Sequence, residues 1–135
     1  MFYIINSDKN KHYVSADDLI GKVYTYEHGY DERMKDIISE EAFLKVNSYR
    51  FYEDKNFKMP ITIDVKLDEL NQKKIDGKIA VYFEYDKFVY DRDGNEISGV
   101  LKAPAVAFII ESEDKLYIED VQLYENIKEV PKEYK

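Results

Sequence analysis

The hydrophobic positions along the chain change their period once, near residue 60. Before that point apolar residues recur three and four positions apart, as on one face of an α-helix, and after it they alternate with polar residues, as in a half-buried β-strand. The pattern therefore predicts helices first and a sheet after them. No internal repeat and no Pro/Gly-rich linker interrupts the 135 residues, which is typical of a single domain.

Three helices are predicted before residue 60. The first is expected to begin after Ser15, a good N-cap residue, and to end at Gly29. A second, short helix is expected through residues 34–38. Ser39 is placed to cap a third helix, and residues 50–59 are expected to be irregular or to hold a short strand.

Four strands are predicted after Pro60. Asp76-Gly77 is a strong signal for the turn between the first two, and residues 91–95 and 112–115 are expected to make the later turns. The third strand is expected over about residues 105–111, and the fourth from Leu116 to Leu123 with one step out of register. The predicted core positions in these strands include Val81, Phe83 and Ile110.

In the second strand the alternation shifts by one residue between Tyr85 and Phe88. Such a shift predicts a β-bulge, and a bulge bends a sheet. Helices followed by a bent antiparallel meander predict an α+β fold, with the N-terminal helices packed in the concave face of a curved four-stranded sheet. We expect this domain to span residues 15–125 and residues 126–135 to form a loose tail.

Residues 1–14 allow two interpretations. The apolar run Phe2-Tyr3-Ile4-Ile5 is consistent with a first strand, and equally with the remaining stub of an N-terminal membrane anchor. No apolar run approaches the roughly 18 residues that a membrane-spanning helix needs. Any membrane attachment is therefore expected to depend on an anchor that this chain does not contain.

The composition excludes several classes of function. The net charge is −8, so phosphates would be repelled and no direct binding of nucleic acid is expected. The absence of cysteine excludes disulfides, thiol catalysis and cysteine-ligated zinc. The two histidines, His12 and His28, lie near predicted helix ends and are interpreted as surface residues.

Residues 91–95 have part of the spacing of a calcium-binding loop. Asp91, Asp93 and Asn95 match its first ligands, but the sixth position is Glu96 where the loop needs glycine, and the twelfth is Lys102 where it needs glutamate. The segment is therefore interpreted as a hairpin turn. We expect no cofactor and no tightly bound divalent metal.

No catalytic site is predicted. Most carboxylates fall on polar faces or in turns, and Glu84 and Asp86 stand out only because they lie beside the predicted bulge. A bulge can aim a polar side chain into a cavity, but a solvated surface position is the more common outcome. The chain is therefore not expected to be an enzyme.

The predicted arrangement resembles the nuclear transport factor 2-like (cystatin-like) superfamily over about residues 15–125. Within the helical half, the segments YTYE (24–27), DERMKDI (31–37) and SEEAF (39–43) are similar to the helical segment of Gram-positive conjugation proteins. The proteins it resembles are extracytoplasmic domains of membrane-anchored type IV secretion assembly factors, which commonly work as oligomers.

The resemblance implies a non-catalytic scaffold on the extracytoplasmic face of the cell membrane, in contact with other secretion-apparatus proteins. Further copies of the same chain are a second candidate partner. A cytoplasmic location is the alternative. Two other functions stay open: a small-ligand-binding domain or enzyme that uses the cone as a pocket, and an extracytoplasmic lipoprotein domain.

Two sets of residues follow from these alternatives. The candidate interaction surface of a scaffold comprises Tyr24, Tyr30, Arg33 and Tyr52. The candidate pocket of a ligand-binding domain comprises Tyr26, Tyr85 and Asp86. A filled inner face would favour the scaffold, whereas an open cavity with converging tyrosine hydroxyls and Asp86 would favour the pocket.

Overall fold

The computed structural model describes residues 12–135. The run Phe2-Tyr3-Ile4-Ile5, on which the predicted strand or anchor stub depends, lies outside the described residues. No helix in the described part of the chain is long and apolar enough to cross a membrane.

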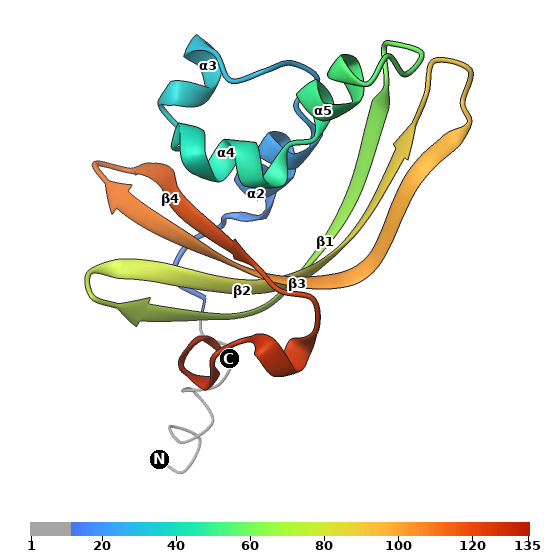
Figure 1. Ribbon diagram of the computed structural model, residues 1–135. Coiled ribbons are helices and arrows are strands. Elements are labelled where there is room, and N and C mark those ends of the chain that lie inside the picture. The colour runs from blue at the N-terminus through green and yellow to red at the C-terminus, as the bar shows by residue number, and fades with distance from the viewer. Residues whose placement is uncertain (1–11) are drawn as a thin grey trace, which may run out of the picture.

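The described chain is α+β, with short helices first and a four-stranded antiparallel sheet after them. The helices are α2 (Asp17–Thr25), α3 (Glu32–Lys35), α4 (Glu40–Val46) and α5 (Tyr49–Asp54). The strands are β1 (Thr62–Ile75), β2 (Lys78–Tyr90), β3 (Glu96–Ser112) and β4 (Lys115–Leu123), in that order across the sheet. The 3₁₀ turns η1 (Ile127–Glu129) and η2 (Lys132–Tyr134) follow. Figure 1 shows the helices over the concave face of a bent sheet and the C-terminal turns against its other face.

The start of α4 is confirmed, and that of α2 is wrong by one residue. Ser39 accepts a hydrogen bond from the N–H of Ala42, as a helix cap does. Ala16, not Ser15, occupies the N-cap position of α2 because Ala16 is fully buried against the sheet while Ser15 points to solvent. The helix also ends at Thr25, before the predicted Gly29, because the chain turns to an extended conformation at the next residue.

The segment predicted to be irregular contains the helix α5. Its residues Tyr49 and Tyr52 are one helical turn apart and both pack against a cluster formed by Ile61, Ile63 and Val89. The second predicted helix is shorter than expected: α3 ends at Lys35 and residue 38 is extended, in a parallel bridge with the edge strand β4. In both places contacts with the sheet, rather than local preference, decide the backbone conformation.

The predicted bulge exists, but the extra residue belongs to β3. Between Ala103 and Val100 the register of β3 to β2 shifts, so that Leu101 and Lys102 stand opposite the single residue Asp86. β3 is also longer than predicted, since it begins at residue 96 rather than near 105.

Because β2 itself is not bulged, its alternation continues past residue 85. Val89 is fully buried on the helix side. The shifted pattern predicted that Phe88 and Tyr90 face the core, but both are only partly buried. The step in β4 is confirmed: the pairs Phe108↔Asp120 and Ile109↔Ile118 leave one residue of β4 without a partner.

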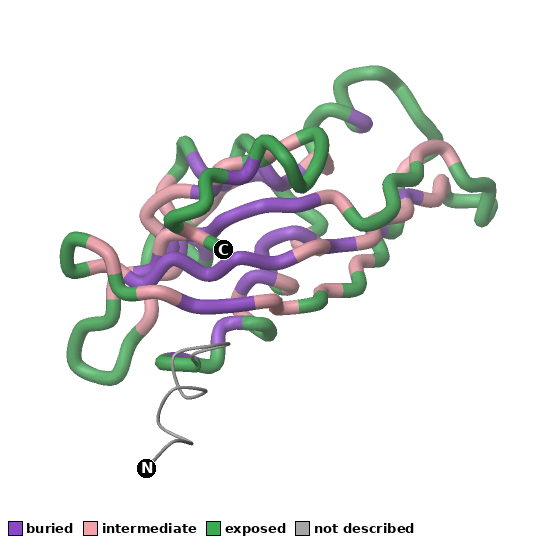
Figure 2. Tube along the Cα trace, turned by 90° about the horizontal axis from the view of Figure 1, so that it is seen from below, coloured by how far each residue is buried: buried purple, intermediate pink, exposed green. Residues whose placement is uncertain are grey.

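The helix-facing side of the sheet forms the main core. Val81 and Phe83 are buried there, as predicted, and Figure 2 shows buried stretches along the middle of the strands with exposed turns at their ends. The prediction for Ile110 is wrong: Ile109 is fully buried and Ile110 only partly. Ile109 pairs with Ile79 on the core face, so its neighbour projects to the other face.

The tail is packed rather than loose. Val130 is 2% exposed and lies in a second cluster, on the outer face of the sheet, with Ala80, Tyr82 and Val106. The ring of Tyr134 stacks edge-on against Phe108, with the centroids 5.2 Å apart. The prediction of a loose tail is therefore wrong, because these two apolar residues cover outer-face positions that water would otherwise reach.

We expect Phe83→Ala to lower the free energy of unfolding by about 3–5 kcal/mol, because the ring is fully buried between helix and sheet. Urea denaturation followed by circular dichroism measures this. Phe51→Ala, at a largely exposed ring, is the matched control. Equal effects of the two substitutions would contradict the described register of β2.

We expect Val130→Asp to lower the free energy of unfolding by about 2 kcal/mol or more, because the carboxylate cannot enter the outer-face cluster and the tail loses its apolar contact. Ile127→Asp makes a similar change at a half-exposed position of the same tail and should have little effect. If both variants melt like the unchanged protein, the tail does not contribute to stability.

Candidate functional site

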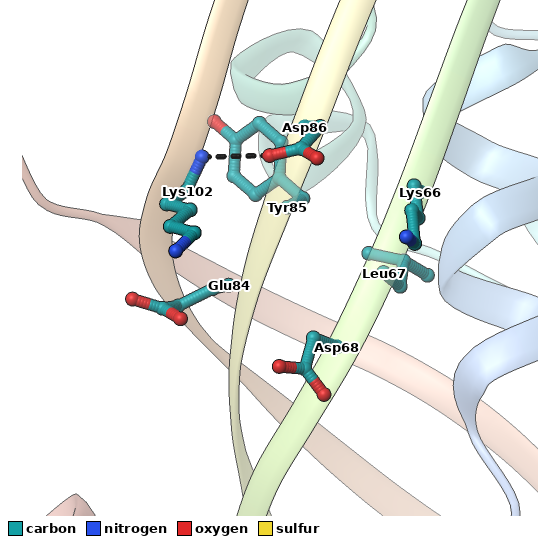
Figure 3. Close-up of a pocket in the computed structure, with 7 residues that line it drawn as sticks. All are labelled: Lys66, Leu67, Asp68, Glu84, Tyr85, Asp86 and Lys102. Carbon is teal, nitrogen blue, oxygen red and sulfur yellow. Dashed lines mark hydrogen bonds between the residues drawn. The ribbon is translucent and has the colours of Figure 1, made fainter.

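A pocket of about 350 Å³ lies on the sheet beside the bulge of β3. Figure 3 shows the residues that line it: Lys66, Leu67, Asp68, Glu84, Tyr85, Asp86 and Lys102. Leu67 and Tyr85 pack into the core on the helix side, so the charged residues that alternate with them along β1 and β2 project to the outer face. The pocket is therefore an open, charged hollow on the side away from the helices.

Asp86 has a structural role at this place. Its Oδ1 accepts a hydrogen bond of 2.8 Å from the backbone N–H of Lys102. Lys102 has a positive φ of 48°, in the left-handed region that few residues other than glycine adopt readily. Asp86 thus stabilises the bulge by pairing with a backbone group that the disturbed register would leave without a partner.

The charges around the pocket are mixed. Lys66 stands directly across from Asp86, which is favourable, whereas Asp68 stands across from Glu84, which places like charges side by side. Lys102 brings a second ammonium group to the rim. No group of three or more His, Asp or Glu side chains in residues 12–135 is arranged to hold a metal ion.

Two of the three candidate pocket residues, Tyr85 and Asp86, line the same hollow, but the hydroxyl groups and the carboxylate do not converge. Tyr85 points into the core, with its ring centroid 4.8 Å from that of Tyr24, and Asp86 projects to the opposite face. Tyr26 lies at a third place: its hydroxyl donates a 2.6 Å hydrogen bond to Asp31, and the guanidinium of Arg33 lies 5.2 Å above its ring. The convergence of tyrosine hydroxyls and Asp86 that would favour a ligand pocket is therefore not observed.

The space between helices and sheet is filled by aromatic side chains. Tyr24 is 1% exposed and packs edge-on against Phe83, while Phe43 contacts the rings of Tyr26 and Tyr30. The hydroxyl of Tyr24 has no hydrogen-bond partner within the described residues, and burial raises the pKa of Tyr24 well above its usual value. Burial also raises the pKa of Tyr85.

The predicted interaction surface is only partly exposed. Tyr24 and Tyr52 are buried, so their assignment to that surface is wrong in the folded domain. Tyr30 is half-buried and its hydroxyl donates to the backbone oxygen of Ile38. Arg33 extends into solvent with 71% of its side chain exposed, although it also pairs with an acidic neighbour.

Sequence reasoning missed two exposed aromatic residues, Phe51 and Phe57. The rings of Phe51 and Phe57 both contact Tyr52 edge-on, at centroid distances of 5.1 and 5.2 Å, and Phe51 is 56% exposed. We call Phe51, Tyr52 and Phe57 the aromatic cluster. The sequence did contain an indication of this exposure. If residues 49–54 form a helix with Tyr49 and Tyr52 facing the core, Phe51 must lie on the opposite, exposed side.

Lys87 is a second residue that the sequence did not single out. It lies on the helix side of β2, where burial lowers the pKa of its ammonium group. Its Nζ donates to the hydroxyl of Ser48, at 3.3 Å. This contact joins the start of α5 to the sheet.

We expect Tyr24→Phe to be almost neutral at pH 7 and to reduce the loss of stability at alkaline pH. The pKa of Tyr24 is higher in the folded than in the unfolded state, so its contribution is complete below about pH 10 and is lost as the pH rises above that value. Unfolding by urea between pH 7 and pH 11 measures the effect.

Tyr13→Phe, at an exposed ring, is the control and should leave the alkaline behaviour unchanged. If the free energy of unfolding of Tyr24→Phe follows that of the unchanged protein over the whole pH range, burial does not oppose ionisation of the Tyr24 phenol.

Comparison with known proteins identifies no relative. No family model matches the chain, and no curated protein sequence or solved structure matches it significantly.

Proposed function

We propose that this chain is a non-catalytic interaction module of a conjugative type IV secretion apparatus, working on the extracytoplasmic face of a Gram-positive cell membrane. In this proposal the fold is a nuclear transport factor 2-like cone, and the partners are other proteins of the apparatus. The bent sheet with helices against its concave face supports the cone, and the similarity of residues 24–43 to conjugation proteins supports the assignment to that apparatus.

The filled interior is the observation that carries the proposal. A ligand-binding domain of this architecture would use the space between helices and sheet, where Tyr24, Phe43 and Phe83 here pack against one another and their neighbours. A domain whose interior is occupied in this way acts through its surface. Assembly is the function that such a surface serves.

The aromatic cluster is the surface feature best suited to a partner. Binding energy at protein interfaces concentrates in a few aromatic and arginine residues that bury large areas at low entropic cost. Phe51 and Phe57 are held on the fixed ring of Tyr52, so they need little ordering when a partner binds. We propose this cluster as the anchor of the interface, in place of the surface of Tyr24, Tyr30, Arg33 and Tyr52 that the sequence suggested.

A second candidate function is supported by the pocket on the outer face. Lys66 and Lys102 could hold the anionic part of a small molecule, and Asp68 and Glu84 its cationic part. In that case the charged residues beside the bulge would be essential and the exposed aromatic residues would not.

We expect deletion of the gene from the mobile element that carries it to abolish transfer, and Phe51→Ser to lower transfer at least about tenfold, the effect of losing about 1.4 kcal/mol of binding energy. The measurement is the frequency of transfer from a donor complemented with each variant. Circular dichroism and a thermal melt check that the variant domain is folded.

Leu123→Ser, a similar change at an exposed apolar residue far along the chain, is the matched control and should support normal transfer. Asp86→Asn keeps the size of the side chain and should also transfer normally. Normal transfer by the deletion strain would refute the assembly function, and failure of Asp86→Asn alone would favour the ligand pocket.

A further inference from the structure

The outer edge of β3 is free along one half of the strand. β4 pairs with β3 only between Ala105 and Ser112, so the segment Glu96–Lys102 has β2 on one side and no strand on the other within the described residues. Figure 1 shows this half of β3 as the outer border of the arm formed by β1, β2 and β3. An unpaired edge presents backbone N–H and C=O groups that a further strand can bind.

Apolar side chains accompany this free edge. Leu101 is 68% exposed, and Val100 beside it is 37% exposed. Exposed apolar residues on an unpaired strand edge favour pairing with another strand, because pairing removes both the apolar surface and the free backbone groups from water. The edge therefore has the properties of a docking site for one strand.

The sequence of the edge is complementary to itself. Read around Gly99, the segment EISGVLK places Glu96 and Lys102 at equal distances on either side, and Ile97 and Leu101 likewise. In an antiparallel pair of two such segments, each Glu96 faces a Lys102 of the other copy. Ile97 already packs against the helix-side cluster with Tyr52, so the pairing rests on the two charge contacts. We propose that a second copy of this chain pairs with the first along this edge, antiparallel and with Gly99 at the two-fold axis.

The side chains that would meet lie on the same face. Lys102 lines the pocket on the outer face, and Glu96 lies over Gly99 on that face, with its Oε2 3.3 Å from the position of a Cβ atom there. The ring of Phe88 covers the same position at 3.0 Å. A Cβ atom at Gly99 would be crowded by these two side chains, and the absence of one leaves the backbone open to a second backbone at the axis.

The edge of β1 does not have this complementarity. Near its start it carries Asp64, Asp68 and Glu69 with the single cation Lys66, so two copies would bring together an excess of carboxylates. Charge complementarity therefore selects the β3 edge as the self-pairing one.

The segment is bounded by the start of β3 at Glu96 on one side and by β4, which pairs with β3 from Ala105, on the other. A two-fold contact between identical edges is closed, so the product is a dimer and not a filament. A contact through one seven-residue strand is short, and the dimer is accordingly expected to dissociate on dilution.

Charge reversal tests the register directly. Glu96→Lys and Lys102→Glu, each alone, place like charges opposite each other at both symmetric contacts and should raise the Kd of the dimer roughly tenfold. Mixing the two variants should form a heterodimer, since each lysine of one copy then faces a glutamate of the other. The double variant should dimerise like the unchanged chain.

Sedimentation equilibrium over a wide range of concentrations measures these states, with the mass rising from 16.1 kDa toward twice that value. Glu113→Lys and Lys115→Glu, in the exposed β3–β4 turn, are the matched controls, and circular dichroism verifies the fold. A chain that stays monomeric at every concentration, single variants that dimerise unchanged, or a mixture that does not associate would each overturn the proposal.

This inference goes beyond the proposed function and does not depend on it. The dimer is measured with the purified chain and no partner, whereas the assembly function is measured as transfer in cells. If the protein is monomeric, the dimer proposal fails and the prediction for transfer still stands. If the deletion strain transfers normally, the assembly function fails and the prediction of a dimer still stands.

Discussion

Three hydrogen bonds of the buried Asn47 side chain hold the helical half of this domain together. Its Nδ2 donates to the backbone oxygens of Val23 and Tyr26, and its Oδ1 accepts from the N–H of Tyr49. Helices of four to nine residues are not stable alone, and α2 ends without a glycine cap. The amide of Asn47 takes the place of that cap, and it fixes where α2 stops and where α5 begins.

The two halves of the sheet are covered differently, and the candidate surfaces all lie on the less covered half. One half is covered on both faces, by the helices on one side and by the tail with Val130 on the other. The arm that carries the β2–β3 turn has α5 on one face and the charged pocket on the other. The aromatic cluster, the pocket and the free edge of β3 therefore all belong to the less protected half of the molecule.

Local patterns predicted the elements whose conformation depends on local sequence. The alternation in β1, the turn at residues 76–77 and the cap at Ser39 were confirmed because each depends on residues close together in the chain. α5 was missed because its helical conformation is stabilised by packing against β1 and β2. Ile110 was misplaced because the apolar pair 109–110 gives no indication of which residue faces the core.

The candidate site was less predictable than the fold, for a related reason. The pattern identified the neighbourhood of Asp86 as irregular, and the bulge is there. It could not show that Asp86 and Tyr85 project to opposite faces of a strand that stays in register. Nor could it show that Tyr24 and Tyr52 are buried while Phe51 is exposed, since this follows from how the helices rotate onto the sheet.

The packed tail also has a consequence for truncation of the chain. Residues 127–134 lie outside every strand, so a truncation after residue 126 keeps all four strands but uncovers Tyr82, Val106 and Phe108 on the outer face. The shortened sheet then exposes a continuous apolar surface, and surfaces of that kind favour aggregation of an otherwise folded domain.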